Sequence, residues 1–453
     1  MVKVRFAPSP TGYLHVGNMR TALVNYLFAR KEKGAFVLRV EDTDIERSDP
    51  AFERALLDDL AWLGLTWDEG PYTQSERTEI YRAHAAVLLK MGLAYKCFCS
   101  KERLDRMREE ALHRGSPPKY DGTCRDLPAE DAARREREGM PYVVRFRAPA
   151  RAIRVKDLIH GEIFFPADHV DDFILLKQGL TPAYNFAVTV DDMLMGITHV
   201  MRGADHVSNT PKQIMLFQAF GQEPPLYGHH SLLTGADQKP LSKRHGATHI
   251  REFREMGILP EALVNYVAVI GRSVKKEIMD EKELIETFSP RSLSPSDSLF
   301  DMEKLRWFNR EHIRRSSTEK LLEKMGLPDS CREKVALVQE NAGTLAEIRD
   351  YLDIFEGSTI TDESMAYLGG VPSSGMIIAS LEEAMKNGVP SFDDALKMVE
   401  SGTGLKKRDL FMCLRISLTG RKHGPPLTDI FSHISREAVT ERISRIKERL
   451  ALS

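Results

Sequence analysis

The first forty residues constrain the fold more than any other stretch of the chain. Residues 2–6, VKVRF, alternate polar and apolar side chains as a strand does, and residues 35–40, AFVLRV, form a second strand-like run. Between them, residues 18–34 place apolar side chains at helical spacing and end at a glycine. A strand–helix–strand unit of this kind predicts a parallel sheet, whose ligands bind at the carboxyl ends of the strands.

A second set of alternating elements follows further along the chain. The segments AYNFAVTVDDML and NTPKQIMLFQAFG predict helices, and GITHVMRG and LYGHHSLL predict strands. Residues 97–141, with clustered cysteines and a charged run, have the character of an insertion, and helical periodicity dominates after residue 250. We therefore predict an α/β part, a Rossmann-type doubly wound parallel sheet with an inserted subdomain, followed by an all-α half.

Composition excludes several classes of protein. The 453 residues, 42% of them apolar and 29% charged, predict two to four globular domains. We expect no membrane span, because no run of about 18 uncharged apolar residues exists. We expect no secretory signal, because the sequence opens on a strand-like stretch without a charged segment, an apolar stretch and a cleavage site. An odd number of cysteines, five, argues against a disulfide framework and favours the cytoplasm. The net charge of -2 does not indicate a nucleic-acid-binding protein, although residues 401–453 are locally basic.

Two loops at the predicted sheet edge indicate a phosphate site. The loop PSPTGYLHVGN places glycines and prolines around His15 at the start of a helix, where backbone N–H groups attract anions. A later loop, KPLSKRHG, gathers lysines and an arginine between glycines. Each loop alone also fits a structural role, a capped turn or a basic surface loop. Together they predict a polyphosphate site.

These loops carry a family resemblance. PSPTGYLHVGN resembles the HIGH signature of class I aminoacyl-tRNA synthetases, and PLSKR resembles their KMSKS loop. The forms RFAPSPTG, VEDTD, HVMRGADHVSNTPKQ and LFDMEKLRWFN resemble the bacterial glutamyl-tRNA synthetases, most densely before residue 315. One departure is Asn18, which stands where HIGH has its second histidine, so His15 is the only imidazole of the motif.

The resemblance implies a domain plan. It comprises a Rossmann catalytic domain over 1–95 and 171–247, an inserted acceptor-end-binding subdomain over 96–170, a linking domain over 248–315 and a helical anticodon-binding domain over 316–453. The implied reaction joins L-glutamate to tRNA(Glu) through glutamyl-adenylate, with ATP and Mg²⁺. We expect a cytoplasmic monomer that does not bind membranes.

The resemblance also implies site residues. His15 and Lys243 would stabilise charge on the reacting phosphorus. The implied ATP-binding residues are His15, Gly17, Asp205, Ser242, Lys243 and Arg244. The implied glutamate-binding residues are Arg5, Ser9, Glu41, Tyr184 and Arg202. Glu41 suits the α-amino group, and a guanidinium, of Arg5 or Arg202, suits the γ-carboxylate.

The cysteine cluster predicts a zinc site. Cys97, Cys99 and Cys124 offer three sulfurs, and Asp126 lies two residues after the third, where zinc-carrying relatives often have histidine or cysteine. Tyr120 or water could replace Asp126 as the fourth ligand. The alternative is three reduced cysteines in a small core.

The C-terminal half bears on tRNA. Lys406 and Arg421 lie in its basic stretch and are expected to contact tRNA phosphates. Family members that accept only tRNA(Glu) often carry an arginine three residues before a Thr-Leu pair, and this chain has Asn341 there. That difference implies relaxed discrimination, with tRNA(Gln) also glutamylated.

Three rival functions are considered at this point. One is the short relative that glutamylates a modified tRNA base, but its chain stops soon after the KMSKS-like loop. A glutaminyl-tRNA synthetase would bind a neutral amide, but that enzyme usually ends in β-barrels, whereas this chain ends in predicted helices. A non-catalytic tRNA- or nucleotide-binding paralogue would not need His15 and Lys243, which are both present.

Overall fold

The computed structural model describes residues 1–44, 48–116, 118–241, 244, 246–405 and 407–451. The chain divides into two compact units. The first comprises Met1–Arg251 and Val264–Asp301, and the second comprises Glu252–Leu263 and Met302–Ser453. Each unit is described by itself below.

The first half of the central sheet is parallel, as the strand–helix–strand pattern predicts. Strand β1 (Lys3–Phe6) pairs with β2 (Ala35–Val40), and β2 pairs with β3 (Glu69–Thr73). Helix α1 (Val16–Lys31) makes the crossover from β1 to β2. All six residues of β2 are buried, as expected for a strand covered on both faces.

The second half of the sheet continues from β1. Strands β9 (His199–Gly203), β10 (Leu226–His230) and β6 (Ile153–Asp157) are parallel, and β7 (Gly161–Phe165) pairs antiparallel with β6. Thr198, just before β9, donates its N–H to the carbonyl of Lys3 at 2.9 Å. The resulting order is β3-β2-β1-β9-β10-β6-β7, which confirms the doubly wound fold. The order reverses between β1 and β9, and open α/β sheets bind ligands at such a point.

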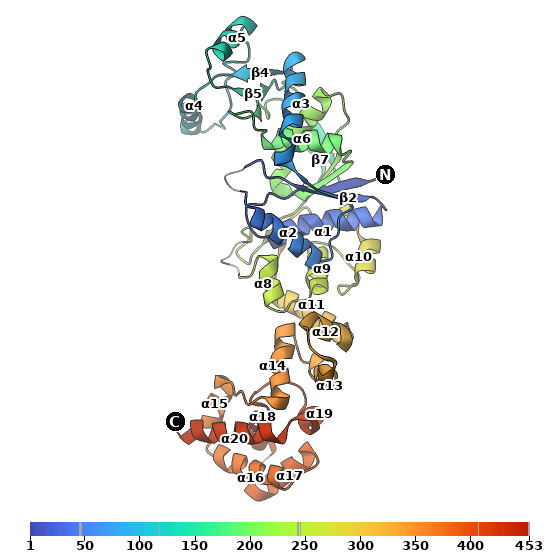
Figure 1. Ribbon diagram of the computed structural model, residues 1–453, viewed down its shortest axis with the longest axis vertical. Helices are drawn as coiled ribbons and strands as arrows, with labels where there is room; N and C mark the ends of the chain where they lie inside the picture. Colours follow the sequence, from blue (N-terminus) through green and yellow to red (C-terminus); the bar gives the residue numbers. More distant parts are fainter. Residues whose placement is uncertain (45–47, 117, 242–243, 245, 406, 452–453) are drawn as a thin grey trace. The chain divides into compact units, whose positions relative to one another are not determined.

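Helices cover the two faces of this sheet. Figure 1 shows α1 on one side of the strands and α3 (Thr78–Lys90) and α6 (Tyr184–Leu194) on the other. Asn25 of α1 donates to the carbonyl of Met201 at 2.9 Å and fixes the helix against β9. Helices α2 (Pro50–Trp62), α7 (Thr210–Ala219) and α10 (Glu281–Thr287) also belong to this unit.

The predicted insertion contains a small antiparallel sheet. It consists of β4 (Ala94–Cys97), β5 (Val143–Phe146) and β8 (Ile174–Leu176), with helices α4 (Lys101–His113) and α5 (Ala129–Arg137). Hydrogen bonding crosses the expected boundary at residue 170, because β6 joins the central sheet and β8 joins the small one. The four domain boundaries expected from the sequence stay a prediction.

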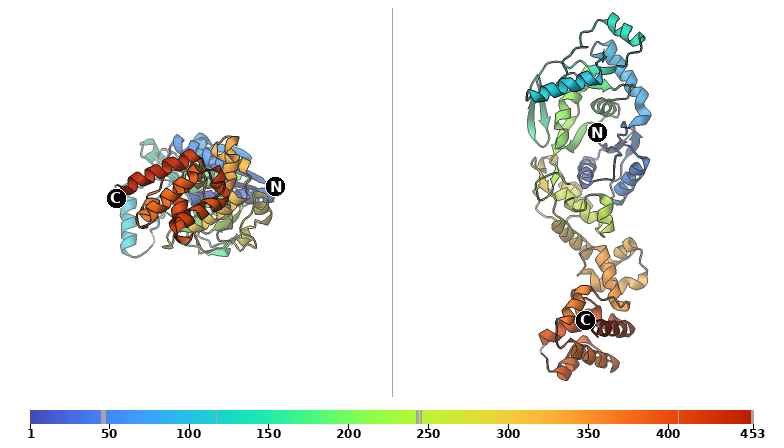
Figure 2. Two further views of the ribbon diagram at one scale, coloured as in Figure 1. Left: turned by 90° about the horizontal axis from the view of Figure 1, so that it is seen from below. Right: turned by 90° about the vertical axis from the view of Figure 1, so that its left-hand side faces the viewer.

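The second unit is helical over its described residues, as the periodicity predicts, and Figure 2 draws it as coiled ribbons in both views. Its helices are α11 (Met302–Arg315), α12 (Thr318–Met325), α13 (Arg332–Gln339), α14 (Leu345–Glu356), α15 (Asp362–Gly369), α16 (Ser374–Lys386), α17 (Phe392–Thr403), α18 (Lys407–Thr419), α19 (Leu427–Ile430) and α20 (Arg436–Ala451). Helices α8 (Ile250–Glu255) and α9 (Pro260–Val269) cross from one unit to the other, and β11 (Leu233–Thr234) pairs with β12 (Ser298–Leu299) in the first unit. No helix among the described residues is long and apolar enough to span a membrane.

Candidate active site

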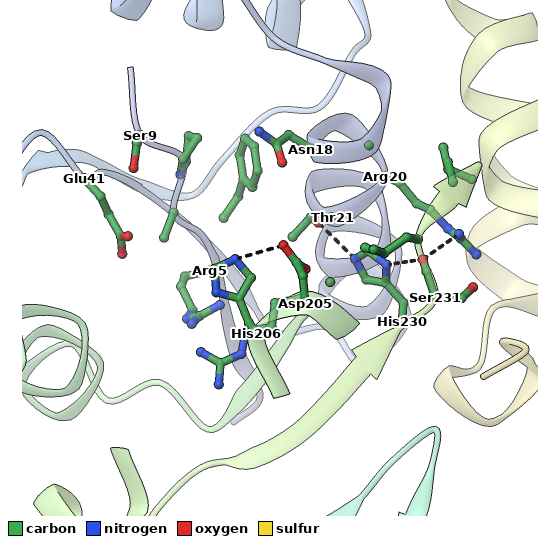
Figure 3. Close-up of a pocket in the computed structure, with 18 of the residues that line it drawn as sticks. Arg5, Ser9, Asn18, Arg20, Thr21, Glu41, Asp205, His206, His230 and Ser231 are labelled. Carbon is green, nitrogen blue, oxygen red and sulfur yellow. Dashed lines mark hydrogen bonds and ion pairs between the residues drawn. The ribbon is translucent and has the colours of Figure 1, made fainter. Parts of the chain in front are cut away.

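A cavity of about 290 Å³ lies where the strand order reverses. The carboxyl ends of β1 and β9 contribute Arg5 and Arg202, and the start of α1 contributes Asn18. Figure 3 shows Ser9 and Glu41 on one side of this cavity and Arg20 and His230 on the other. The five residues implied to bind glutamate all line it: Arg5, Ser9, Glu41, Tyr184 and Arg202.

A buried charge cluster holds one wall of the cavity. Arg5 donates through Nε to both oxygens of Asp192, at 3.2 and 3.3 Å. Arg39 donates to Asp192 at 2.7 Å and to Glu41 at 3.1 Å. Burial opposes charge on Asp192, but Arg5 and Arg39 hold its pKa below the usual range. Because Arg5 uses only Nε, its two terminal nitrogens have no partner among the described residues and can bind a carboxylate.

Glu41 presents an acidic group to the same cavity. Arg39 donates only to Oε1, so Oε2 has no hydrogen-bond donor among the described residues. Burial raises the pKa of Glu41 to about 7, against the opposing charges of Arg39 and Arg5. This carboxylate can therefore accept a hydrogen bond from an ammonium group, and its charge changes near neutral pH.

Sequence reasoning missed Arg39, Asp191 and Asp192. Arg39 interrupts the apolar run AFVLRV, and the two aspartates lie in VTVDDML, a segment with few other polar residues. A charged side chain inside a buried strand or helix needs a partner of opposite charge. The charged residues within these apolar segments were therefore the sequence signal that could have revealed the cluster. Asp191 accepts from Arg77 and Tyr81, both at 2.8 Å, and does not line the cavity.

Tyr184 and Asp205 meet through a histidine. The Tyr184 hydroxyl lies 3.3 Å from Nδ1 of His206, and Asp205 lies 3.7 Å from Nε2 of the same ring. Burial raises the pKa of Tyr184 to about 12, so the phenol stays neutral at physiological pH. Asp205 lines the cavity, and its side chain is half-exposed, so its carboxylate is open to a ligand.

His15 is the N-cap of α1. Its Nδ1 accepts the N–H of Gly17 at 3.1 Å, which places the proton of the neutral ring on Nε2 and makes that nitrogen a donor. We expected the backbone N–H groups in the first turn of α1 to be available to a phosphate. Two of them already have hydrogen-bond acceptors within the protein. The N–H of Gly17 donates to the His15 side chain, and the N–H of Val16 donates to the carbonyl of Thr248 at 2.9 Å. Gly17 and Asn18 line the cavity, but His15 does not.

The structure describes only part of the basic loop KPLSKRHG, residues 239–246. Ser242 and Lys243, two of the implied ATP-binding residues, lie outside the described residues. Arg244 is exposed and pairs with Asp237 at 3.2 Å. Ile250 donates its N–H to the carbonyl of Leu14 at 3.0 Å, which holds the chain after the loop against the loop before α1.

Two further cavity residues were not foreseen. Arg20 is almost fully buried and donates to the carbonyl of Ser231 at 2.9 Å. His230 contacts the Thr21 hydroxyl through Nε2 at 2.9 Å. Burial lowers the pKa of His230 to about 3, so the ring is neutral. These contacts link α1 to the end of β10, and therefore fix two walls of the cavity to each other.

The three cysteines of the insertion form a cluster that suits a metal. The sulfurs of Cys97, Cys99 and Cys124 lie within 4.8 Å of one another, and those of Cys99 and Cys124 are 3.6 Å apart. Two thiolates on one tetrahedral zinc lie about 3.8 Å apart at Zn–S distances of about 2.3 Å. The donor set therefore fits zinc.

The structure does not bring Asp126 to these sulfurs. Its carboxylate is 87% exposed and pairs with Arg147 at 3.0 Å. The hydroxyl of Tyr120 lies instead 3.3 Å from the sulfur of Cys97 and 3.5 Å from that of Cys99. Tyr120 stays beside the cluster because its ring packs under the guanidinium of Arg145, at 4.0 Å.

The residues proposed to contact tRNA lie in the helical unit. Asn341 follows α13 and precedes Thr344, whose hydroxyl caps α14. Arg421 donates to the carbonyl of Asp350 at 2.8 Å, so part of its guanidinium serves the fold. Lys406 lies outside the described residues.

Comparison with known families decides what this site belongs to. Residues 1–307 match the family model "tRNA synthetases class I (E and Q), catalytic domain", and residues 299–447 match "Anticodon binding domain". The chain belongs to the class I (E and Q) tRNA synthetases. Arg5, Glu41 and Arg202, which line the cavity, all lie within the matched catalytic region.

Full-length relatives agree with this assignment. The chain is 42% identical to "Glutamate--tRNA ligase" of Natranaerobius thermophilus, covering 98% of this chain and 97% of the relative. It is 41% identical to the protein of the same name from Bacillus subtilis, covering 98% and 99%. A crystal structure of a glutamate tRNA ligase from Elizabethkingia meningosepticum in complex with its amino acid is 32% identical. It has a TM-score of 0.83 and covers 99% of both chains.

Proposed function

We propose that this protein is a glutamate–tRNA ligase, which activates L-glutamate with ATP and transfers it to the 3′ end of tRNA(Glu). The observation that carries the proposal is the cavity at the sheet reversal, where the guanidiniums of Arg5 and Arg202 and the carboxylate of Glu41 line the same space. L-Glutamate has the matching charges, two carboxylates and one ammonium. Full-length relatives with the same printed activity support this substrate.

The charge pattern favours glutamate over glutamine. Arg5 offers both terminal nitrogens, and a guanidinium with two open N–H groups on adjacent nitrogens matches a carboxylate better than an amide. Glu41 binds the α-ammonium through Oε2, on the same wall as Arg5. A glutaminyl-tRNA synthetase would leave a buried guanidinium facing an amide N–H₂, which is a donor meeting a donor.

The reaction needs no nucleophile from the protein. The α-carboxylate of glutamate attacks the α-phosphorus of ATP, pyrophosphate leaves, and a mixed anhydride forms. A hydroxyl of the terminal tRNA adenosine then attacks the carbonyl carbon, and AMP leaves. The protein holds the reactants in line and stabilises the charge of the pentavalent phosphorus. We assign that stabilisation to His15, through Nε2, and to Lys243, with Mg²⁺ bound to the phosphates of ATP.

We assign zinc to the insertion. Cys97, Cys99 and Cys124 would hold it, with the oxygen of Tyr120 nearest to the fourth position. A zinc ion held by three thiolates is a structural site, so its contribution is to stabilise the small sheet that contains Cys97.

The proposal extends to tRNA(Gln). Asn341 lies in the turn between α13 and α14. Its side chain is shorter and uncharged, whereas family members that accept only tRNA(Glu) often carry arginine there. Loss of that cation removes one means of distinguishing the last anticodon base. Lys406 and Arg421 would contribute sequence-independent phosphate contacts.

Aminoacylation tests the whole proposal. The purified protein is assayed with ATP, glutamate or glutamine, and purified tRNA(Glu) or tRNA(Gln), with tRNA present throughout. We expect glutamate to be joined to tRNA(Glu) and glutamine to be rejected. Charging with glutamine, or no charging at all, overturns the proposal. Rejection of tRNA(Gln) removes only its extension to that tRNA.

A further inference from the structure

A buried Asp–His pair lies behind the guanidinium of Arg202, which lines the cavity. Arg202 is 4% exposed and donates through Nε to Nε2 of His229 at 3.2 Å. Nδ1 of His229 lies 2.6 Å from Oδ2 of Asp157. Nε2 of His229 also lies 3.1 Å from the hydroxyl of Thr210. His229 is fully buried, and neither it nor Thr210 lines the cavity, so its route to a substrate runs through Arg202.

Arg202 and Asp157 fix the tautomer of His229, and the Thr210 hydroxyl, which can both donate and accept, is compatible with it. A guanidinium only donates, so Nε2 must present a lone pair to Arg202. The carboxylate of Asp157 accepts, so the proton lies on Nδ1. Asp157 is held in turn by backbone, because its Oδ1 accepts the N–H groups of Ile159 and His160, both at 2.9 Å. Burial and the charge of Arg202 keep the pKa of His229 low, although Asp157 opposes them, so the ring is neutral.

Arg202 is surrounded by neutral acceptors. Its terminal nitrogens donate to Oε1 of Gln213 and to the hydroxyl of Thr210, each at 2.9 Å. Three of its five N–H groups are thereby used, and one remains on each terminal nitrogen. No carboxylate among the described residues lies within ion-pair distance of Arg202, in contrast to Arg5 and Arg39, which share Asp192.

We propose that Asp157 and His229 are positioning residues for substrate binding. They lock the guanidinium of Arg202 in one orientation without neutralising it, so that its two remaining N–H groups and its charge are available to a carboxylate of the amino acid. A direct carboxylate partner would fix the arginine equally well but would compete with the substrate for its charge. The neutral imidazole transmits the orientation and keeps the anion of Asp157 one ring away from Arg202. This inference rests on the proposed function, because it takes glutamate as the substrate.

The substitution Asp157→Asn tests the tautomer. The two backbone N–H groups keep the amide oxygen at the Oδ1 position, so the N–H₂ group takes the place of Oδ2. It would donate to Nδ1 and move the proton of His229 to Nε2, where it faces the N–H of Arg202. The conflict displaces Arg202 while leaving volume and packing almost unchanged.

The matched control is Asp172→Asn. Asp172 is equally buried, at 5% exposure, and accepts a backbone N–H from Ala148 at 2.8 Å, but it lies just before β8 of the small sheet and does not line the cavity. This variant shows how much the KM for glutamate changes when a buried carboxylate is lost away from the cavity.

Steady-state kinetics of the two variants and NMR of the wild-type protein test this proposal. For Asp157→Asn we expect the KM for glutamate to rise about 10- to 100-fold, the range for one lost hydrogen bond to a charged group. The KM for ATP should stay within about twofold, and Asp172→Asn should leave the KM for glutamate unchanged. Nitrogen-15 spectra of the wild-type protein should show His229 as the Nδ1–H tautomer at neutral pH.

An Nε2–H or doubly protonated ring in the wild type overturns the inference without any variant. So does an unchanged KM for glutamate in a folded Asp157→Asn protein, or an equal rise in both aspartate variants. A wild-type protein that charges no tRNA with glutamate is a different result, because it overturns the proposed function instead.

Discussion

Arg5 and Asp192 form a buried ion pair at 3.2 Å across 187 residues of sequence. Both oxygens of Asp192 accept from Nε of Arg5, so the guanidinium is held by one edge and keeps its terminal nitrogens for the cavity. The pair joins the end of β1 to α6. A residue that contacts no substrate thus decides where a substrate-binding arginine lies.

The substitution Asp192→Asn should therefore damage both stability and binding. It leaves Arg5 and Arg39 without their shared counter-charge, and breaking a buried pair costs about 3–5 kcal/mol. We expect a lower denaturant midpoint and a higher KM for glutamate. Asp191→Asn is the matched control, because Asp191 is the adjacent residue and equally buried, but among the described residues its ion pairs are with Arg77 at 2.8 Å and Arg39 at 3.7 Å rather than with Arg5. If both variants raise the KM equally, Asp192 has no special role in holding Arg5.

Binding of glutamate should depend on pH through Glu41. Burial raises its pKa to about 7 in the unliganded protein, and only the ionised form attracts the α-ammonium. Below that pH the carboxyl is neutral and affinity falls; above it affinity reaches a plateau. At pH 6 about a tenth of Glu41 is ionised, so the KM for glutamate should be about tenfold higher than at pH 8. Glu41→Gln should raise the KM and abolish this dependence, whereas an unaltered pH profile in that variant would exclude Glu41 as its source.

His15 should affect the rate through its Nε2 donor. The substitution His15→Ala removes the helix cap and the donor, whereas His15→Asn retains a cap for the N–H of Gly17. We expect both variants to lower kcat for adenylate formation by about 10²–10³, the usual cost of one charge-stabilising donor. Pyrophosphate exchange in the presence of tRNA measures this. Near-normal activity of His15→Asn would mean that the residue only caps the helix.

Metal content should follow the side chains that lie beside the cysteines. Cys124→Ser should lose zinc, and Tyr120→Phe should weaken zinc binding in a competition assay with a chelator. Asp126→Ala should bind zinc as the wild type does, because Asp126 is exposed and pairs with Arg147. If Asp126→Ala loses zinc and Tyr120→Phe retains it, Asp126 is the fourth ligand, as the sequence predicted.

Restoring the missing cation should sharpen tRNA choice. Asn341→Arg is expected to lower the kcat/KM for tRNA(Gln) by about tenfold or more, with a smaller effect on tRNA(Glu), since one base contact is worth about 1–3 kcal/mol. Charging of both purified tRNAs measures the ratio. An unchanged ratio would show that position 341 does not read the anticodon.

The doubly wound sheet could be predicted because its evidence is local. The alternation in residues 2–6, the apolar run of β2 and the helical stripe of α1 each arise within one element, and their order implies parallel pairing. The cavity residues Arg5, Glu41 and Arg202 were expected only from the resemblance to a known family. The joining of β6 to β10 was not foreseen, since pairing between strands seventy residues apart leaves no mark in either strand.

The sequence by itself determined the order of strands and helices, the polar residues at the strand ends and the three sulfurs, because these depend on residue type and near spacing. Only the tertiary structure decided which charges share a partner. Asp192 with Arg5, His229 with Arg202 and Tyr120 with the cysteines meet through packing of distant segments. Burial then gives each contact its strength, because a charge or donor removed from water must be satisfied by whatever the fold brings beside it.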